Sequence, residues 1–143
     1  MISLSLAKRL KEAGLVWQAS VNDYFAIPDR DMDERVFVIS NILANLNIFR
    51  GWPVVTFHGT AEWALDYILT KEVVWLPREE QLRQLLLESL PDKAITSLQL
   101  TFADGHYRCT ITWNDGNLQG EAPSAAGAYG QVLLSILQRQ AEA

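Results

Sequence analysis

Residues 94–137 read AITSLQLTFADGHYRCTITWNDGNLQGEAPSAAGAYGQVLLSIL, and this stretch decides the fold class. Its first part alternates apolar and polar residues in three segments, which Asp104-Gly105 and Asp115-Gly116 separate. A period of two is typical of a half-buried strand, and Asp-Gly between two such strands is typical of a tight hairpin turn. The stretch therefore predicts a three-stranded antiparallel meander, followed by a helix that begins at Pro123 and Ser124.

The two turns also predict which residues face each other. A two-residue turn at Asp104-Gly105 pairs Phe102 with Tyr107, Leu100 with Cys109, and Leu98 with Ile111. The second turn, at Asp115-Gly116, pairs Trp113 with Leu118 and Ile111 with Gly120. Every apolar residue then lies on one face of the sheet, which we expect the final helix to cover with Ala125, Tyr129, Val132, Leu133, Ile136 and Leu137. Small residues at 126–128 and Gly130 are expected to bring one end of this helix close to the sheet.

The first half of the chain predicts a helix and then strands. Ser3 or Ser5 caps a helix with Leu6, Ala7, Leu10 and Ala13 on one face, and Gly14 ends it. Residues 24–27 read as a short strand that Pro28 stops, and residues 35–40 read as a well-buried strand. Residues 42–49 fit either a helical face or a strand; we favour a strand over 43–49 that turns at Arg50-Gly51 into residues 52–57.

The middle of the chain predicts two further helices around a short strand. Thr60 is placed to cap a helix over Ala61–Leu69, which is apolar on nearly every side. Residues 72–76 read as a strand. Pro77 then begins a helix with acidic residues in its first turn, an ion pair between Glu79 and Arg83, and a core stripe of Leu82, Leu85, Leu86 and Leu90.

These elements predict an α+β fold in which antiparallel meander sheets are each followed by a packing helix. The strands near 35–40, 43–49 and 52–57 and the helix after them repeat the order of the C-terminal stretch, which suggests two similar βββα halves, 1–70 and 72–143. No low-complexity linker separates these halves, so residues 1–143 are expected to form a single domain. A length of 143 residues is common for one domain.

Composition excludes several classes of function. A net charge of −5 and the lack of a basic patch argue against nucleic-acid binding, which depends on clustered Lys and Arg. No apolar run is long enough for a membrane span, and Lys8, Arg9 and Lys11 interrupt any signal-peptide core. Because Cys109 is the only cysteine, no internal disulfide can form, and we expect a cytoplasmic protein.

Two groups of residues resemble catalytic or metal sites in type but not in arrangement. Asp29, Asp31 and Asp33 have the opening spacing of a calcium loop, yet the required glycine is Glu34 and the final acid is Ser40. We interpret this segment as a solvated loop.

The second group, Cys109 with His106 and Asp104, has the residue types of a thiol nucleophile and its base. The predicted register, however, puts Cys109 on the apolar face, where a thiol is inert, and the other two residues in the turn. The sequence thus predicts a core cysteine.

A third candidate is His58-Gly59-Thr60, where a strand meets a helix N-terminus. Such junctions can bind anions through main-chain N–H groups, but a single glycine is more typical of an ordinary turn. The chain contains neither a GxGxxG motif nor a phosphate-binding loop, so no nucleotide cofactor is predicted. We therefore predict no catalytic, cofactor-binding or metal-binding residues.

Large aromatic residues gather in the middle third of the chain, and they suit protein interfaces as well as cores. The candidate interface residues are Trp52, Trp63, Tyr67 and Trp75. Because the helix expected over Ala61–Leu69 has almost no polar face, we expect it to contribute to a homo-oligomer contact.

Four segments carry a resemblance to known sequences: LAKRLKEAGLVW, ERVFVIS, GTAEWALDYI and WLPREEQLRQLL. They resemble small uncharacterised bacterial and phage-encoded proteins of similar length, some of which are labelled pilus-assembly proteins. The ATPase known by that label needs a phosphate-binding loop, which this sequence lacks. The resemblance implies a compact small domain and carries over no functional residue.

The sequence as a whole favours a non-enzymatic protein-interaction or accessory domain that forms a homo-oligomer. One alternative is a small-ligand-binding module with an apolar pocket between the two halves. Another is a small enzyme that brings His58 or His106 together with a carboxylate of the loop 29–34.

Overall fold

The computed structural model describes residues 1–28, 35–40, 44–57 and 67–142. The chain forms two compact units, one of residues 1–15 with 77–143 and one of residues 16–76, here called unit 1 and unit 2. The described residues contain three α-helices and three three-stranded antiparallel sheets, which confirms the α+β class. The unit boundaries differ from the expected halves 1–70 and 72–143, and a duplication stays a prediction.

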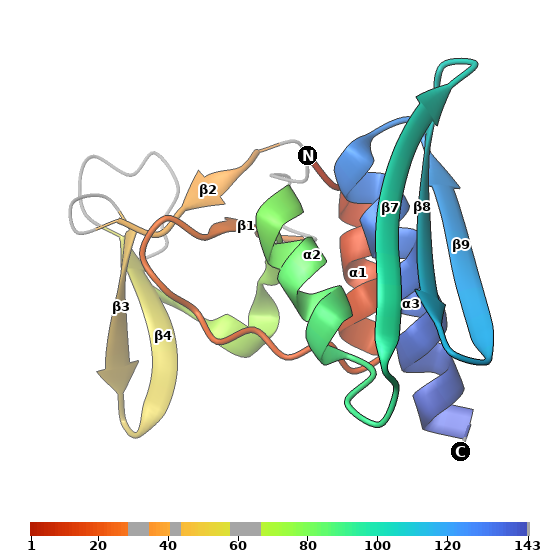
Figure 1. Cartoon of the computed structure of the whole chain (residues 1–143). Coiled ribbons are helices and arrows are strands. Elements are labelled where there is room, and N and C mark those ends of the chain that lie inside the picture. The colour runs from red at the N-terminus through yellow and green to blue at the C-terminus, as the bar shows by residue number, and fades with distance from the viewer. Residues whose placement is uncertain (29–34, 41–43, 58–66, 143) are drawn as a thin grey trace. The chain divides into compact units, whose positions relative to one another are not determined.

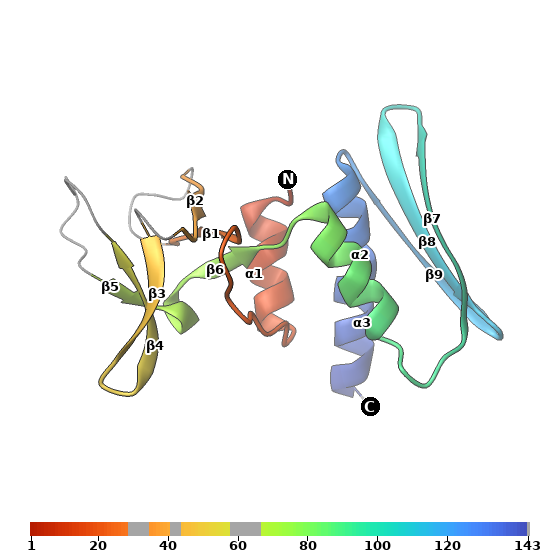
Figure 2. The same ribbon diagram turned by 60° about the vertical axis from the view of Figure 1, so that its left-hand side comes forward.

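Unit 1 is built of three layers (Figure 1). The first layer is the sheet of β7 (Ile95–Ala103), β8 (His106–Trp113) and β9 (Gly116–Ala122). α3 (Ala125–Glu142) packs on β8 and β9, with α2 (Glu79–Glu88) beside it. α1 (Leu4–Glu12) packs against α3 on the side away from the sheet (Figure 2).

In the meander, the pairing of β7 with β8 has the predicted register, whereas the pairing of β8 with β9 has a different one. Phe102 faces Tyr107, Leu100 faces Cys109 and Leu98 faces Ile111, as expected. At the second turn Trp113 faces Gly116, and Ile111 faces Leu118 rather than Gly120, so the predicted pairing there is wrong. The turn residues are Asn114 and Asp115, and Gly116 begins β9 opposite Trp113, whose ring would lie 2.8 Å from a Cβ at this position. The register differs by two residues, so each side chain keeps its predicted face.

α3 begins as predicted and is buried more completely than predicted. The Ser124 hydroxyl accepts a hydrogen bond from the main-chain N–H of Gly127, 3.0 Å away, at the start of the helix. Nine residues between Ala126 and Ile136 are buried, because the helix contacts α1 and α2 as well as the sheet. Gly130 faces α1 rather than the sheet: a Cβ there would lie 2.8 Å from Leu6.

α1 and α2 match the sequence apart from one boundary. Ser3 caps α1 by accepting a hydrogen bond from the N–H of Leu6, and Gly14 follows the helix with a φ of +109°. α2 begins at Glu79, two residues later than expected, because Arg78 is extended and Pro77 therefore precedes the cap. The expected pair of Glu79 and Arg83 is present at 3.8 Å.

Unit 2 contains two small sheets that share a core. One has the order β2-β1-β6, from β1 (Tyr24–Ala26), β2 (Phe37–Val38) and β6 (Val74–Leu76). The other has the order β3-β4-β5, from β3 (Ala44–Phe49), β4 (Trp52–Phe57) and β5 (Tyr67–Leu69), with a short 3₁₀ helix, η1 (Thr70–Glu72), after β5. The core cluster consists of Phe25, Ile27, Ile39, Val55, Ile68 and Val73, against which Trp17 and Phe37 pack.

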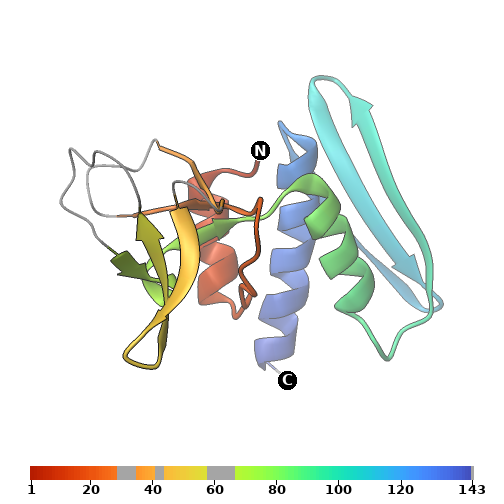
Figure 3. The same cartoon turned by 90° about the vertical axis from the view of Figure 1, so that its left-hand side faces the viewer.

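The hairpin β3–β4 confirms the strand interpretation of residues 44–49 (Figure 3, orange to yellow). Arg50 and Gly51 both have positive φ, +51° and +84°, as a two-residue type I′ turn requires. A type I′ turn has the same twist as the strands that it joins. The β-branched residues of β4 favour a strand, and pairing with β4 makes residues 44–49 a strand rather than a helix.

Three expectations for unit 2 are corrected. The strand over 35–40 is only Phe37–Val38, and Val36 and Val38 are exposed, although Ile39 is buried. This strand pairs with β1 rather than with β3, so 35–40, 43–49 and 52–57 do not form one meander. Tyr67–Leu69 form a strand on β4 rather than the end of a helix, because a short apolar run fits a buried strand as well as a helix. The loop 29–34, His58-Gly59-Thr60 and residues 61–66 lie outside the described residues.

Gly120 provides a test of how closely α3 packs on β9. A Cβ at this position would lie 2.9 Å from the main-chain oxygen of Ala128 and 2.9 Å from Cβ of Gln131, neither of which can move independently of the helix. We expect Gly120→Ala to lower the free energy of unfolding by about 1–3 kcal/mol, the usual cost of overpacking. Urea denaturation measures this loss, and Gln119→Ala on the exposed face of β9 is the control. An equal effect of the two substitutions would contradict the close packing.

Candidate interaction surface

The hairpin β3–β4 exposes an unusual number of large apolar side chains for so short a segment. Ile48 is 77% exposed and Trp52 is 55% exposed, and Leu46 and Phe49 are exposed as well. Single exposed apolar residues are normal on protein surfaces, but a contiguous group is typical of a binding site. We call Leu46, Ile48, Phe49, Trp52 and Pro53 the hairpin patch.

The pairing register places these side chains on two faces of the hairpin. Leu46 and Ile48 lie opposite Val55 and Pro53, so these four share one face. At its inner end this face joins the core through Val55, which is fully buried, whereas Ile48 and Pro53 at the outer end are exposed. The apolar face of the hairpin thus continues from the core of unit 2 to solvent.

An open groove of about 340 Å³ lies over the outer part of this face. Its lining comes from the hairpin and from two other segments of unit 2: Trp17, Ala19, Leu46, Asn47, Ile48, Pro53 and Thr70. Except for Asn47 and Thr70 these residues are apolar. The groove therefore offers a mainly apolar surface with a few polar atoms, which is the usual character of a binding groove.

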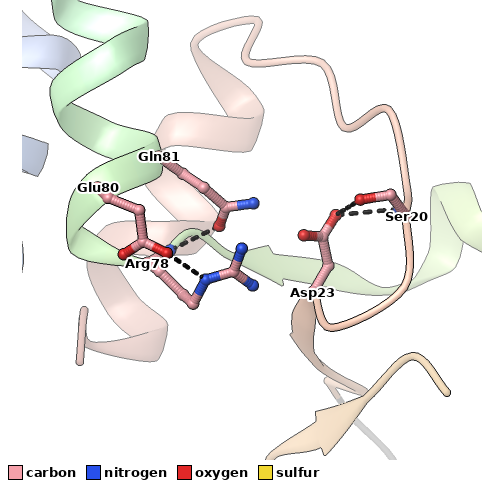
Figure 4. Close-up of polar contacts among 5 residues, drawn as sticks. All are labelled: Ser20, Asp23, Arg78, Glu80 and Gln81. Carbon is pink, nitrogen blue, oxygen red and sulfur yellow. Dashed lines mark hydrogen bonds and ion pairs between the residues drawn. The ribbon is translucent and has the colours of Figure 1, made fainter.

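Asp23 fixes the segment that contributes Trp17 and Ala19 to the groove. Its side chain is almost completely buried, and its Oδ2 accepts hydrogen bonds from Trp17 Nε1 at 2.9 Å and from Ser20 N at 3.1 Å. The Ser20 hydroxyl lies 3.4 Å from the same oxygen (Figure 4). These donors satisfy a buried polar group, and in doing so they hold the indole of Trp17 beside Phe25, with ring centroids 5.9 Å apart.

The tip of the hairpin carries two aromatic rings, each with a cation over it. The guanidinium carbon of Arg50 lies 5.2 Å from the ring centroid of Phe49, and Lys71 Nζ lies 4.4 Å from that of Trp52. Phe49 and Trp52 face each other across the turn, on the side of the hairpin opposite Ile48. The tip thus combines two aromatic rings with two cations in a chain whose net charge is −5.

The four interface residues predicted from the sequence have different positions. Trp52 belongs to the hairpin patch. Trp75 lies in β6, partly buried, and its Nε1 is buried with no acceptor among the described residues. The main chain of Tyr67 belongs to β5, and Trp63 lies outside the described residues. An interface made by these four residues stays a prediction.

The sequence prediction missed Trp17, Leu46, Ile48 and Pro53. Leu46 and Ile48 alternate with two asparagines, which was a visible signal of a strand with one apolar face. The approach of Trp17 to that face depends on Asp23 and has no signal in the spacing of residues.

The cysteine and histidine of the meander are separated as predicted. Cys109 is fully buried, and this burial raises the pKa of its thiol to about 11. His106 is exposed at the start of β8, with Nδ1 3.3 Å from the main-chain oxygen of Asp104. A buried thiol with a raised pKa is a poor nucleophile.

Arg78 and its neighbours form the start of α2 (Figure 4). Gln81 Oε1 accepts a hydrogen bond from the main-chain N–H of Arg78 at 2.8 Å, and Arg78 Nε donates to Glu80 Oε1 at 2.6 Å. The hydrogen bond from Arg78 lowers the pKa of Glu80, whose side chain is exposed. These contacts are typical of a helix N-terminus and indicate no ligand.

The described residues contain neither a cluster of metal ligands nor a helix suited to a membrane. No three His, Cys, Asp or Glu side chains among them are grouped closely enough to hold a metal ion. None of the helices in the described part of the chain combines the length and the apolar character that crossing a membrane requires.

Comparison with known proteins gives no assignment. No protein-family model, curated protein or solved structure matches the chain. The resemblance to bacterial and phage-encoded proteins therefore stays an expectation.

Trp17 and Trp75 provide a matched pair of substitutions. Trp17→Phe removes a hydrogen bond to a buried carboxyl group, and we expect it to lower the free energy of unfolding by about 2 kcal/mol. Trp75→Phe removes a buried N–H that has no acceptor among the described residues, so we expect a change within about 1 kcal/mol, since the ring's packing is largely kept. Urea denaturation of both variants measures the difference. Equal losses of free energy in the two variants would show that the hydrogen bond from Trp17 to Asp23 does not stabilise the fold.

The pKa of Cys109 predicts a loss of stability at high pH. Because the folded-state value of about 11 lies above the ordinary value of 9.0, the neutral thiol stabilises the fold below pH 9, and this contribution disappears as the pH rises through 11. Between pH 8 and pH 10 the wild type should lose about 1 kcal/mol more than Cys109→Ala, which has no thiol to ionise. Urea denaturation of both proteins at both pH values tests this, and parallel losses would contradict the burial of the thiol.

Proposed function

We propose that this protein is a non-enzymatic interaction module that binds a protein partner through the hairpin patch. The observation that carries the proposal is the exposure of Ile48 and its neighbours on a hairpin whose other strand, β4, contributes Val55 to the core. A hairpin anchored in a core holds its exposed side chains in fixed positions, so little entropy is lost on binding. Aromatic and apolar residues beside an arginine are the composition that interfaces favour.

The proposal agrees with the leading interpretation of the sequence, an interaction domain, but assigns the interaction surface to a different segment. The sequence pointed to a helix over Ala61–Leu69, whereas the hairpin patch consists of residues 46–53 and retains only Trp52 from the predicted set. The homo-oligomer expected from the sequence stays a prediction. Light scattering at micromolar concentration tests it, and a dimeric mass that Ile48→Glu reduces to a monomeric one would make a second copy the partner.

Ile48→Glu is the direct test of the proposed surface. Because Ile48 is so exposed, the substitution should leave the free energy of unfolding within about 0.5 kcal/mol of the wild type. A carboxylate at the centre of an apolar interface should weaken binding at least tenfold. Phe102→Glu is the matched control, since Phe102 is 63% exposed at the tip of another hairpin, in unit 1.

The measurement begins with capture of partners by the wild type and both variants from the source cell extract. A protein retained by the wild type and by Phe102→Glu, but not by Ile48→Glu, is then purified and titrated against all three by calorimetry. We expect saturable binding that Ile48→Glu weakens at least tenfold. The proposed function is refuted if no protein or second copy binds in a manner that depends on Ile48.

A further inference from the structure

The outer edge of β3 carries main-chain groups that point away from β4 and that no strand of the described residues pairs with. In a two-residue type I′ turn the flanking residues form a hydrogen-bonded pair, so the N–H and C=O of Phe49 point toward Trp52. Because hydrogen-bonded and non-hydrogen-bonded pairs alternate along an antiparallel ladder, those of Leu46 and Ile48 point away from β4. No described strand pairs with β3 on that side.

The sequence of β3 does nothing to prevent pairing at this edge. Natural edge strands are usually protected by charged side chains, prolines or bulges. β3 reads ANLNIF, with neither a charge nor a proline, and its ladder with β4 runs without a bulge over all six residues. An unprotected edge of this kind is suited to adding a strand from a partner, as in peptide recognition by β-augmentation.

The two faces of the hairpin would meet different side chains of an added strand. On the face of Leu46 and Ile48, side chains at alternate positions would enter the apolar groove. On the opposite face, the intervening side chains would approach the tip where Arg50 and Lys71 lie over Phe49 and Trp52. Arg50 directly follows β3, and residues 44–57 contain no acid, so this end of the strand attracts negative charge.

We propose that β3 binds an extended segment of the partner protein as an additional strand, with apolar residues at alternate positions and an acidic residue between them. This inference rests on the proposed function and names the chemistry of its partner. A second copy of this chain fits less well, because its own β3 has no acid to offer Arg50 and Lys71.

Selection from a library of random ten-residue peptides displayed on phage, with the full chain as bait, tests the pattern. We expect the selected peptides to carry apolar residues at positions i and i+2 and Asp or Glu at a position of the opposite parity. Ile48→Glu should weaken the best peptide at least tenfold, and Phe102→Glu should leave it unchanged. Selected peptides without this pattern, or no selected peptide, would overturn the proposal.

Backbone methylation distinguishes an added strand from a peptide held by its side chains alone. Each main-chain N–H of the best synthetic peptide is replaced in turn by N–CH₃, and affinity is measured by fluorescence anisotropy. We expect losses of at least tenfold at alternate positions and little change at the positions between them, because only every second N–H points toward β3. Losses without this alternation would refute the added strand.

A double-mutant cycle tests the charge. Arg50→Gln with Lys71→Gln should weaken the acidic peptide about fivefold or more, and should not weaken a peptide in which Asn or Gln replaces the acid. An equal effect on both peptides would contradict the acidic position.

The proposed function has its own test. Binding of a full-length partner that depends on Ile48 supports the interaction surface. The added strand is refuted, although the surface is not, if the bound segment lacks the alternating apolar residues or the acid. The same holds if the bound partner is a second copy of the chain. If partner binding does not depend on Ile48, the surface itself is refuted.

Discussion

Burial of the Asp23 carboxyl group is the constraint on which unit 2 depends. A buried polar group without partners costs free energy, so the chain around it must supply donors, and Trp17 and Ser20 do so. The main chain of Asp23 and its neighbour Asn22 also pairs with Ile39, through N···O distances of 2.9 Å in both directions. One residue thus joins the segment of Trp17, the start of β1 and the residue after β2. The hydrogen bonds that the buried Asp23 carboxyl group needs therefore also position the segment of Trp17 that lines the groove.

Unit 1 is organised by a different constraint, the burial of α3. Its small residues let β9 and α1 approach from different sides, and the long apolar run between them is buried by the sheet and by both other helices. This explains why the first residues of the chain belong to the same unit as the last. Cys109 lies fully buried in this packing, which accounts for the raised pKa of its thiol.

The two units differ in what they leave exposed. The hairpin β7–β8 of unit 1 ends in one exposed aromatic residue, Phe102, which packs on Tyr107 with ring centroids 4.9 Å apart. The hairpin of unit 2 exposes several large side chains, a groove and an unprotected strand edge in the same place. This coincidence of features is the basis of the proposed interaction surface.

The sequence by itself determined the elements that carry local signals. The Asp104-Gly105 turn set the first register of the meander, Ser3 and Ser124 marked helix starts, and Arg50-Gly51 with the alternation of Leu46 and Ile48 marked the second hairpin. Where the local signal was ambiguous, the sequence prediction was wrong: Tyr67–Leu69 fit a helix or a strand, and only pairing with β4 decided between them.

Only the tertiary structure determined which apolar side chains are exposed. The sequence singled out Trp52 as a candidate but could not show that Ile48 is exposed while Val55, on the same face, is buried. Exposure depends on which distant segments cover a strand, and the Trp17 segment that lines the groove is held by hydrogen bonds to Asp23 and by packing on the core. Periodicity and turn residues predict the conformation of residues that are close in sequence. Contacts between residues far apart in sequence form only in the folded molecule, so these local patterns do not predict them.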